Sequence, residues 1–480
     1  MFEVLTLKIP TAAWFALGTW VVSALYRFRR SQKLLINLPG PSAPSWVTGH
    51  FKALFGFNAI PYYQYLVANY GPTVKVNRAF GGEFIWTLDP AAMHSILVKD
   101  RVNFERPTGN VLFIRSVIGG GLLGLTGDEH RIHRKMPIFM SIAEQTCDAI
   151  ETDINSSQGD IDVFPWMTAA ALELVGEAGL GYSFDSFKGK RNEYSVAIKD
   201  IVFVASTINL VADAHAPGRR FFIKVIPFSA LLPYIYNIGT PSFRRWVLQH
   251  APISSVQKLL QAAKLQNNQA EEVLRARQAL LASGGDLTSE AGRGRDIMTL
   301  LMKANEAEGS ENHISHDAMI GHMNVFIFAG HETTSTAVSR ILNILADNED
   351  IQVKLREEIR TYFKEHQDDA NHDALLELPY LDAVVRETLR VYGPVSNIVR
   401  QSQVDTVIPL EYPIETPTGK ITSIPIKKGT GVVMNVVMAN RYDKTWGEQA
   451  DQFRPERWIG NKLDEVTEPG AHLPGVYSSM

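Results

Sequence analysis

Two long stretches of helical periodicity dominate this sequence of 480 residues. Residues 254–282 repeat apolar side chains at helical spacing and carry a polar outer face, which predicts an amphipathic helix. Residues 317–345 share the period but are more apolar, so we expect this second helix to lie centrally. The sequence further predicts helices over 350–366 and 381–391, and short strands over 74–77, 84–88, 421–425 and 432–437. Together these patterns predict a mainly α fold with a minor β-sheet (α+β), in one large domain.

The amino terminus carries an uncharged stretch of 18 residues, from residue 9 to residue 26, followed at once by Arg27, Arg29 and Arg30. At about 1.5 Å of rise per residue, this length is near the lower limit for a helix that spans a bilayer. The basic residues after it predict that the rest of the chain is cytosolic. A cleaved signal peptide would carry its positive charges before the apolar core. A transmembrane anchor over residues 1–30 is therefore favoured over a signal peptide or a buried helix.

The segment after the anchor is rich in proline. Residues 38–44 read Leu-Pro-Gly-Pro-Ser-Ala-Pro, and such a run cannot continue a helix. It predicts a stiff, extended hinge between the anchor and a globular body. The sequence is therefore divided into an anchor over 1–30, a Pro-rich hinge over 31–45 and a single domain over 46–480.

Charge and cysteine content exclude two classes of protein. The sequence has 47 Lys and Arg against 51 Asp and Glu, a formal charge of −4, which argues against nucleic acid as a partner. The single cysteine, Cys147, excludes an intramolecular disulfide framework and fits a reducing compartment.

A run of small and polar residues surrounds Gly330, inside a helical pattern where glycine costs about 1 kcal/mol relative to alanine. One reading is a helix end at this glycine, with Thr333 or Ser335 capping a new helix. In the other, Ala329 and Gly330 let a flat cofactor approach the backbone, while Glu332 and Thr333 supply an acid and an alcohol that relay protons. The zinc pattern H-E-x-x-H also starts here, but Ser335 occupies its second histidine position.

Glu387 and Arg390 are spaced to pair on one face of a helix. As a surface ion pair they would contribute only ~0.2–0.5 kcal/mol. The helix is apolar around much of its circumference, however, which favours burial of the pair, and a buried pair needs further hydrogen-bonding partners. Arg457 is a candidate for that partner.

The order and spacing of these motifs resemble the haem-thiolate monooxygenases of the cytochrome P-450 family, in a fungal microsomal form. The shared features are A-G-x-E-T-T at 329–334, E-x-x-R at 387–390, and P-E-R-W at 455–458. Residues 127–135 resemble the family's propionate-binding segment, and Arg400 lies ten residues after Arg390, where the family has another propionate-binding arginine. The anchor and the hinge also resemble those of microsomal members.

The resemblance implies roles, a cofactor and partners. Glu332 and Thr333 would be catalytic proton donors, and Ala329 and Gly330 would leave room above the haem. The haem propionates would be bound by His130, Arg134 and Arg400, and a buried charge network would consist of Glu387, Arg390 and Arg457. The substrate cavity would be lined by residues 202–204, Val395, Ser396 and Ile398. The cofactor would be haem b, and the partners an NADPH-dependent reductase, dioxygen and a small lipophilic substrate such as a terpenoid of secondary metabolism. The protein would be a single-pass protein of the endoplasmic reticulum membrane, with a cytosolic catalytic domain.

One feature of the family has no counterpart in this sequence. Family members carry the thiolate ligand in a loop resembling F-x-x-G-x-x-x-C-x-G after the P-E-R-W motif. Only 23 residues follow Arg457 and none is cysteine, while Cys147 lacks the glycines of that loop, so no metal ligand is identified. The sequence thus predicts a domain without its carboxy-terminal ligand loop and last helix. Two hypotheses remain open: a monooxygenase, or an inactive, truncated family member that acts as a non-enzymatic membrane protein.

Overall fold

The computed structural model describes residues 38–111, 139–187, 239–250, 254–283, 314–366 and 374–460, apart from a few isolated positions, together with Met298 and Met302. The predicted anchor over 1–30 and the first part of the hinge lie outside the described residues. His130, Arg134 and residues 202–204 lie outside them as well. Among the helices that the structure describes, none combines the length and the hydropathy needed to cross a bilayer.

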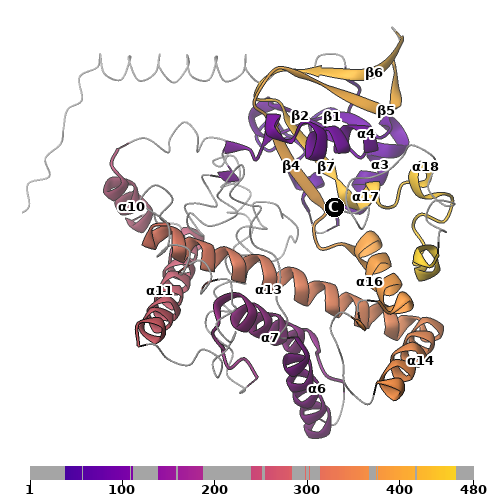
Figure 1. Cartoon of the computed structure of the whole chain (residues 1–480). Helices are drawn as coiled ribbons and strands as arrows, with labels where there is room; N and C mark the ends of the chain where they lie inside the picture. Colours follow the sequence, from indigo (N-terminus) through magenta and orange to yellow (C-terminus); the bar gives the residue numbers. More distant parts are fainter. Residues whose placement is uncertain are drawn as a thin grey trace, which may run out of the picture.

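A twisted sheet of five strands forms one part of the fold, in the order β1-β2-β7-β4-β3 (Figure 1). Its strands are β1 (Thr73–Asn77), β2 (Glu83–Thr87), β7 (Gly431–Asn435), β4 (Asn397–Ser402) and β3 (Phe104–Glu105). Strands β2 and β7 pair in parallel, and the other neighbours are antiparallel. Every residue of β7 is buried, which explains why this strand is a nearly continuous apolar run.

Strand β7 ends two residues earlier than the pattern over 432–437 predicts. The Asn435 side chain accepts a hydrogen bond from the Met438 backbone N–H at 2.8 Å and so caps the short helix α17 (Val436–Ala439). Local capping at Asn435 therefore overrides the strand preference of the two valines that follow.

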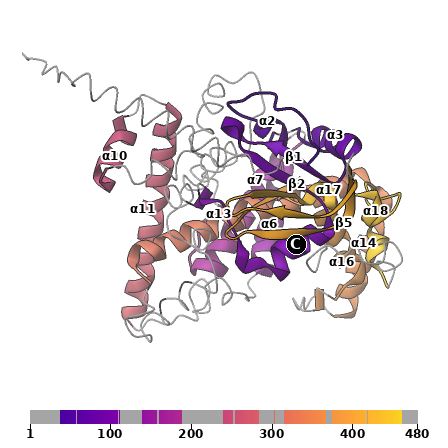
Figure 2. The ribbon, with the colours of Figure 1, turned by 90° about the horizontal axis from the view of Figure 1, so that it is seen from above.

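A helical layer makes up the rest, with α13 (His316–Asp347) running across the middle of the molecule (Figure 1). Ser315 caps its first turn, because the Ser315 hydroxyl accepts from the Ala318 N–H at 3.3 Å. Its neighbours are α7 (Phe164–Val175), α11 (Ser254–Ala282), α14 (Glu349–Glu365) and α16 (Pro379–Tyr392). Helix α6 (Phe139–Ser156) packs on α7, while α10 (Pro241–His250) and α11 lie away from the sheet (Figures 1 and 2). The mainly α fold with a minor sheet is confirmed.

Helix α13 continues through Gly330 without a break. The Thr333 hydroxyl donates to the Ala329 carbonyl and the Ser335 hydroxyl to the Glu332 carbonyl, so neither side chain caps a new helix. The alternative of a helix end at Gly330 is therefore wrong.

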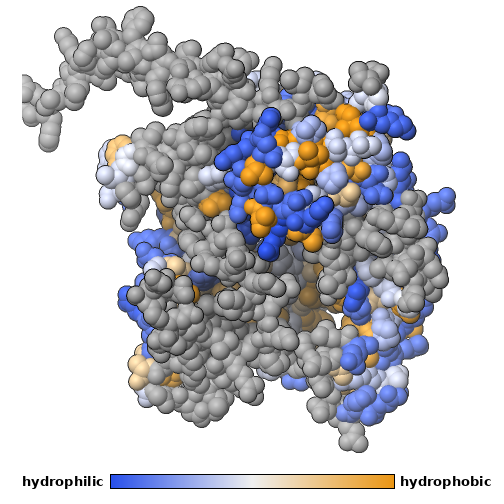
Figure 3. Space-filling view, turned by 45° about the horizontal axis from the view of Figure 1, so that its top comes forward, coloured by the Kyte–Doolittle hydropathy of each residue, from blue (hydrophilic) through white to orange (hydrophobic). Residues whose placement is uncertain are grey.

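A second sheet pairs β5 (Thr406–Thr416) with β6 (Gly419–Ile426). The sequence pattern found β6 but missed β5, because two prolines, Pro409 and Pro413, interrupt its alternation. A register shift between Pro409 and Ile414 accommodates them. One face of β5 is buried and the other exposed, and on the surface in Figure 3 hydrophobic side chains are interspersed among hydrophilic ones.

Asp89 connects the two sheets. Its buried carboxylate accepts from the backbone N–H groups of Ala92 (3.0 Å), Glu411 (3.0 Å) and Tyr412 (2.8 Å). The first bond caps α4 (Pro90–His94) and the other two hold β5. Burial raises the pKa of Asp89, and the three N–H donors offset part of that shift.

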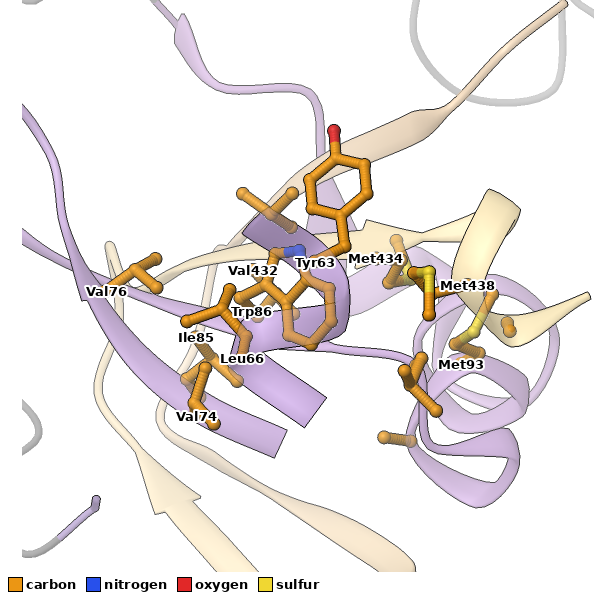
Figure 4. Close-up of a cluster of buried hydrophobic side chains, with 14 of the residues drawn as sticks. Tyr63, Leu66, Val74, Val76, Ile85, Trp86, Met93, Val432, Met434 and Met438 are labelled. Atoms are coloured by element: carbon orange, nitrogen blue, oxygen red, sulfur yellow. The ribbon is translucent and has the colours of Figure 1, made fainter. Parts of the chain in front are cut away.

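The main core lies where α3 (Ile60–Tyr70) covers the larger sheet (Figure 4). Leu66, Trp86 and Val432 are fully buried there, and the Tyr63 and Trp86 ring centroids lie 5.9 Å apart. Each fully buried aliphatic side chain of this kind contributes about 1.5–3 kcal/mol. This packing sets the position of β4 and thereby of the cavity beside it.

Candidate active site

A cavity of about 700 Å³ lies where α13, β4 and the amino-terminal elements meet. Its volume is within the range of roughly 300–1,000 Å³ that is usual for cofactor and ligand sites. Three groups of residues line it, from α13 (Phe328, Ala329, Glu332, Thr333), from β4 and the turn before it (394–400), and from the amino-terminal part (Phe55, Gly56, Ala59, Ile60, Tyr63, Arg106, Pro107, Asn110).

Two arginines, one directly after β3 and one in β4, line one part of this cavity. In the antiparallel pair of β3 and β4, Glu105 lies opposite Gln401, which brings Arg106 beside Arg400. Burial and the charge of Arg106 lower the pKa of Arg400. Burial likewise lowers the pKa of Arg106, and Glu105 offsets part of that shift. Two like charges enclosed together fit a ligand that carries carboxylates.

Arg400 is a predicted site residue, whereas sequence reasoning missed Arg106. The pairing of a two-residue strand, β3, puts Arg106 in place, and its partner strand lies almost 300 residues further along the chain. A short strand of this kind leaves no periodic signal in the sequence.

The α13 wall carries the predicted acid and alcohol. Ala329, Glu332 and Thr333 all line the cavity, as expected for residues three and four positions apart on one helix face. The Thr333 hydroxyl donates to the Ala329 carbonyl at 2.7 Å. Glu332 Oε2 lies 3.8 Å from Nδ1 of the buried His331. The wall therefore offers a carboxyl and a hydroxyl within one helical turn.

Gly330 has a different role from the one that the resemblance implies. It does not line the cavity, because the helix turns it toward α7. A Cβ at this position would lie 2.5 Å from Cγ2 of Val175. The glycine thus allows close packing of α13 on α7, and that packing offsets its cost within a helix.

Three of the predicted cavity-lining residues, Val395, Ser396 and Ile398, do line the cavity. All of β4 except Ser402 is only partly buried, although β4 lies between β7 and β3. Since β3 pairs only with Gln401 and Ser402, residues 397–400 have a strand on one side alone among the described residues, and the cavity lies against them.

Glu387 is the centre of the predicted charge network. Arg390 donates to both of its carboxylate oxygens at 2.8 Å, and Arg457 Nε donates at 2.9 Å. The Arg454 N–H (2.8 Å) and the Trp458 indole N–H (2.9 Å) also donate to this carboxylate. Burial alone would raise the pKa of Glu387, but the hydrogen bonds and charges of the two arginines outweigh it and lower the pKa. The pair is buried, so the reading as a surface ion pair is excluded.

The two arginines extend the network to the backbone. Arg390 donates to the carbonyls of Asn440, Ala450 and Gln452, and its guanidinium lies 5.0 Å from the Trp446 ring centroid. Arg457 donates to the Gln449 carbonyl at 3.1 Å. The network therefore holds the chain from residue 440 to residue 458 against α16.

Comparisons with known proteins agree with this arrangement. The cytochrome P-450 family profile matches residues 236–474. Cytochrome P-450 monooxygenase 91 of Postia placenta is 36% identical over 93% of this chain and 82% of its own length. The chain belongs to the cytochrome P-450 family. Monooxygenase 212 of the same fungus is 33% identical (97% and 85% covered), and ganoderic acid synthetase of Ganoderma lucidum is 31% identical (96% and 84% covered).

The cofactor of this cytochrome P-450 monooxygenase family is haem, and the described cavity fits part of it. Arg106 and Arg400 suit its two carboxylates, and the α13 wall provides an acid and an alcohol beside a small residue. None of the described residues that line the cavity is a cysteine. Cys147 is exposed on α6 and does not line it. The described part of the cavity therefore supplies two arginines that suit the haem carboxylates, and the α13 wall, but no thiolate.

Replacing Arg390 by Ala should lower the free energy of unfolding by ~3–5 kcal/mol, because it leaves the Glu387 carboxylate buried without its main partner. Arg386→Ala is the matched control, since Arg386 forms a partly exposed pair with Asp382 on the same helix at 2.6 Å. The control should lose less than about 1 kcal/mol. Urea unfolding followed by circular dichroism measures both. Equal losses for the two variants would contradict the role given to the network.

Proposed function

We propose that this cytochrome P-450 oxidises a small lipophilic molecule with dioxygen, using electrons that an NADPH-dependent reductase delivers. The observation that carries this proposal is the shared cavity, which Glu332 and Thr333 line together with Arg106 and Arg400. One oxygen atom enters the substrate and the other leaves as water, so the reaction needs protons as well as electrons. The α13 wall has the groups to supply them.

Haem, when bound, supplies the iron at which dioxygen is activated. Arg106 and Arg400 would hold its carboxylates by charge-assisted hydrogen bonds. The Glu332 carboxyl, beside the cavity, would deliver protons to it, and the Thr333 hydroxyl, which donates to the Ala329 carbonyl, would take part in that delivery.

The substrate that we propose is a terpenoid of secondary metabolism. The lining is mainly apolar, with Phe55, Ile60, Phe328 and Ile398 among its residues. The relation to a fungal protein named ganoderic acid synthetase supports the assignment to secondary metabolism.

We also propose that residues 1–30 anchor the protein in the endoplasmic reticulum membrane, with the catalytic domain in the cytosol. An uncharged stretch of 18 residues followed by three arginines supports this proposal. In yeast microsomes, the full chain should stay in the membrane pellet after an alkaline carbonate wash. Deletion of residues 1–30 should release it.

Leu17→Arg tests the anchor with a single change, since a charge at the centre of a spanning helix costs ~2.5–3.5 kcal/mol. Leu7→Arg, which lies before the uncharged stretch, is its control and should leave the protein in the pellet. If the shortened protein resists the carbonate wash as the full chain does, the anchor is assigned to the wrong segment.

The protein translated from its complete transcript should bind haem and give, when reduced under carbon monoxide, the red-shifted Soret band typical of a thiolate ligand. Absorption spectroscopy of the purified protein measures this. A preparation that folds but neither retains haem nor gives that band supports the non-enzymatic alternative. The observation that supports this alternative is that Cys147 lies outside the cavity lining.

Thr333→Val should leave the haem spectrum nearly unchanged and uncouple the reaction. The substitution keeps the branched shape and removes only the hydroxyl. Product formed per NADPH consumed should fall by up to ~10²-fold, the lower range for a general acid–base group, and hydrogen peroxide should rise. Thr334→Val, at the exposed neighbouring position, is the control and should stay coupled. Unchanged coupling in Thr333→Val would remove Thr333 from the proton path.

A further inference from the structure

A chain of four hydrogen bonds passes beside the cavity. The Met438 backbone N–H donates to Asn435 Oδ1 at 2.8 Å, and Asn435 Nδ2 donates to Asn397 Oδ1 at 2.7 Å. Asn397 Nδ2 then donates to the Tyr63 hydroxyl at 2.8 Å, and that hydroxyl donates to the Leu54 carbonyl. The chain links α17, β7, β4, α3 and α2 (Phe51–Leu54), and its first and last partners are backbone groups that cannot change roles.

The direction of this chain follows from its first bond. A backbone N–H can only donate, so Asn435 must present its oxygen there and its amide nitrogen to Asn397. Asn397 must therefore accept with its own oxygen and face Tyr63 with its nitrogen. The Tyr63 hydroxyl, having accepted that bond, gives its hydrogen to Leu54. If the Asn397 amide were flipped, its nitrogen would face the Asn435 nitrogen, so that two donors would meet. Its oxygen would face the Tyr63 oxygen, so that two acceptors would meet.

The supports of Asn397 are rigid. Tyr63 and Asn435 are almost fully buried, at 2% and 0% exposure. Figure 4 shows the Tyr63 ring against the apolar core beside Trp86, with its hydroxyl pointing away from that core. Core packing thus fixes the hydroxyl, and the hydroxyl fixes Asn397.

One hydrogen of the Asn397 amide nitrogen is not used in this chain of hydrogen bonds. An amide nitrogen carries two hydrogens, and only one has an acceptor among the residues that the structure describes. Asn397 lines the cavity, as Tyr63 does, in a wall that is otherwise largely apolar. The fixed orientation keeps the amide nitrogen of Asn397, and not its oxygen, beside Tyr63 at this wall.

We propose that Asn397 determines specificity by donating this hydrogen bond to an oxygen atom of the substrate. The substrate is then a lipophile that already carries a hydroxyl or carbonyl group, rather than a pure hydrocarbon. A hydrocarbon packed against Asn397 would displace water from this amide hydrogen and leave it without an acceptor, and sites built around a hydrogen bond discriminate against analogues that lack it. Tyr63 and Asn435 are positioning residues. The inference rests on the proposed function, in which this cavity holds the substrate.

Matched pairs of probes test the proposal on the full, haem-loaded chain: farnesol with farnesene, 1-dodecanol with dodecane, and cholesterol with cholestane. The measurement is the dissociation constant, from the change that each probe causes in the Soret spectrum. In the wild type, the oxygenated member of every pair that binds should bind about three- to tenfold more tightly. Asn397→Leu, which keeps the size of the side chain, should reduce that ratio to about one while the hydrocarbon keeps its affinity.

Two further variants separate specificity from stability. Asn397→Asp keeps the shape of the side chain but removes both amide hydrogens, so the ratio should fall even if Asn397→Leu folds poorly. Asn69→Leu, at an exposed position of α3, is the matched control and should keep the wild-type ratio.

Equal affinities within every pair in the wild type, or a preference that survives in Asn397→Leu, would overturn the inference and leave the monooxygenase proposal intact. Loss of haem from Asn397→Leu with equal weakening of both probes would overturn it too, because the donor would then serve a haem carboxylate. Failure of all probes to bind the haem-loaded protein would exclude the cavity as a lipophile site. Absence of haem and of the thiolate-type band would instead defeat the proposed function itself.

Discussion

The bidentate pair of Glu387 and Arg390 is the interaction on which the rest of the described structure depends. Both side chains have no solvent exposure, and a lone charge in that position would be severely destabilising. Arg457, the Arg454 N–H, the Trp458 indole and three backbone carbonyls are its further partners. Because these partners lie between residues 440 and 458, the pair attaches a distant part of the chain to one helix.

The position of the cavity follows from that attachment. Helix α16 leads through a short turn directly into β4, which carries Asn397 and Arg400 on the cavity wall. The opposite wall, α13, packs on α16 as well. A displacement of α16 would therefore move both walls, so the charge network supports the site without touching a ligand.

Two faces of α13 have different roles. Ala329, Glu332 and Thr333 face the cavity, and Gly330 faces α7 closely enough to exclude even a methyl group. Two requirements, a proton-donating wall and close helix packing, are thus met by adjacent residues because successive helix positions point about 100° apart. On β4, a cation at Arg400 and an oriented amide at Asn397 give the cavity polar points within an apolar lining.

The sequence by itself determined the features that depend on local spacing. Periodicity located α11, α13, α14 and α16 to within two residues at each end, and the spacing of Glu387 and Arg390 predicted their pairing on one helix face. Only the tertiary structure decided that Gly330 lies on the side of α13 that packs on α7, because the sequence of a helix does not say which neighbour covers each of its sides. The same holds for Arg106 beside Arg400 and for the Tyr63–Asn397 bond, whose residues lie 334 positions apart. No local pattern encodes a contact of that range, because it exists only when the sheet brings the strands together.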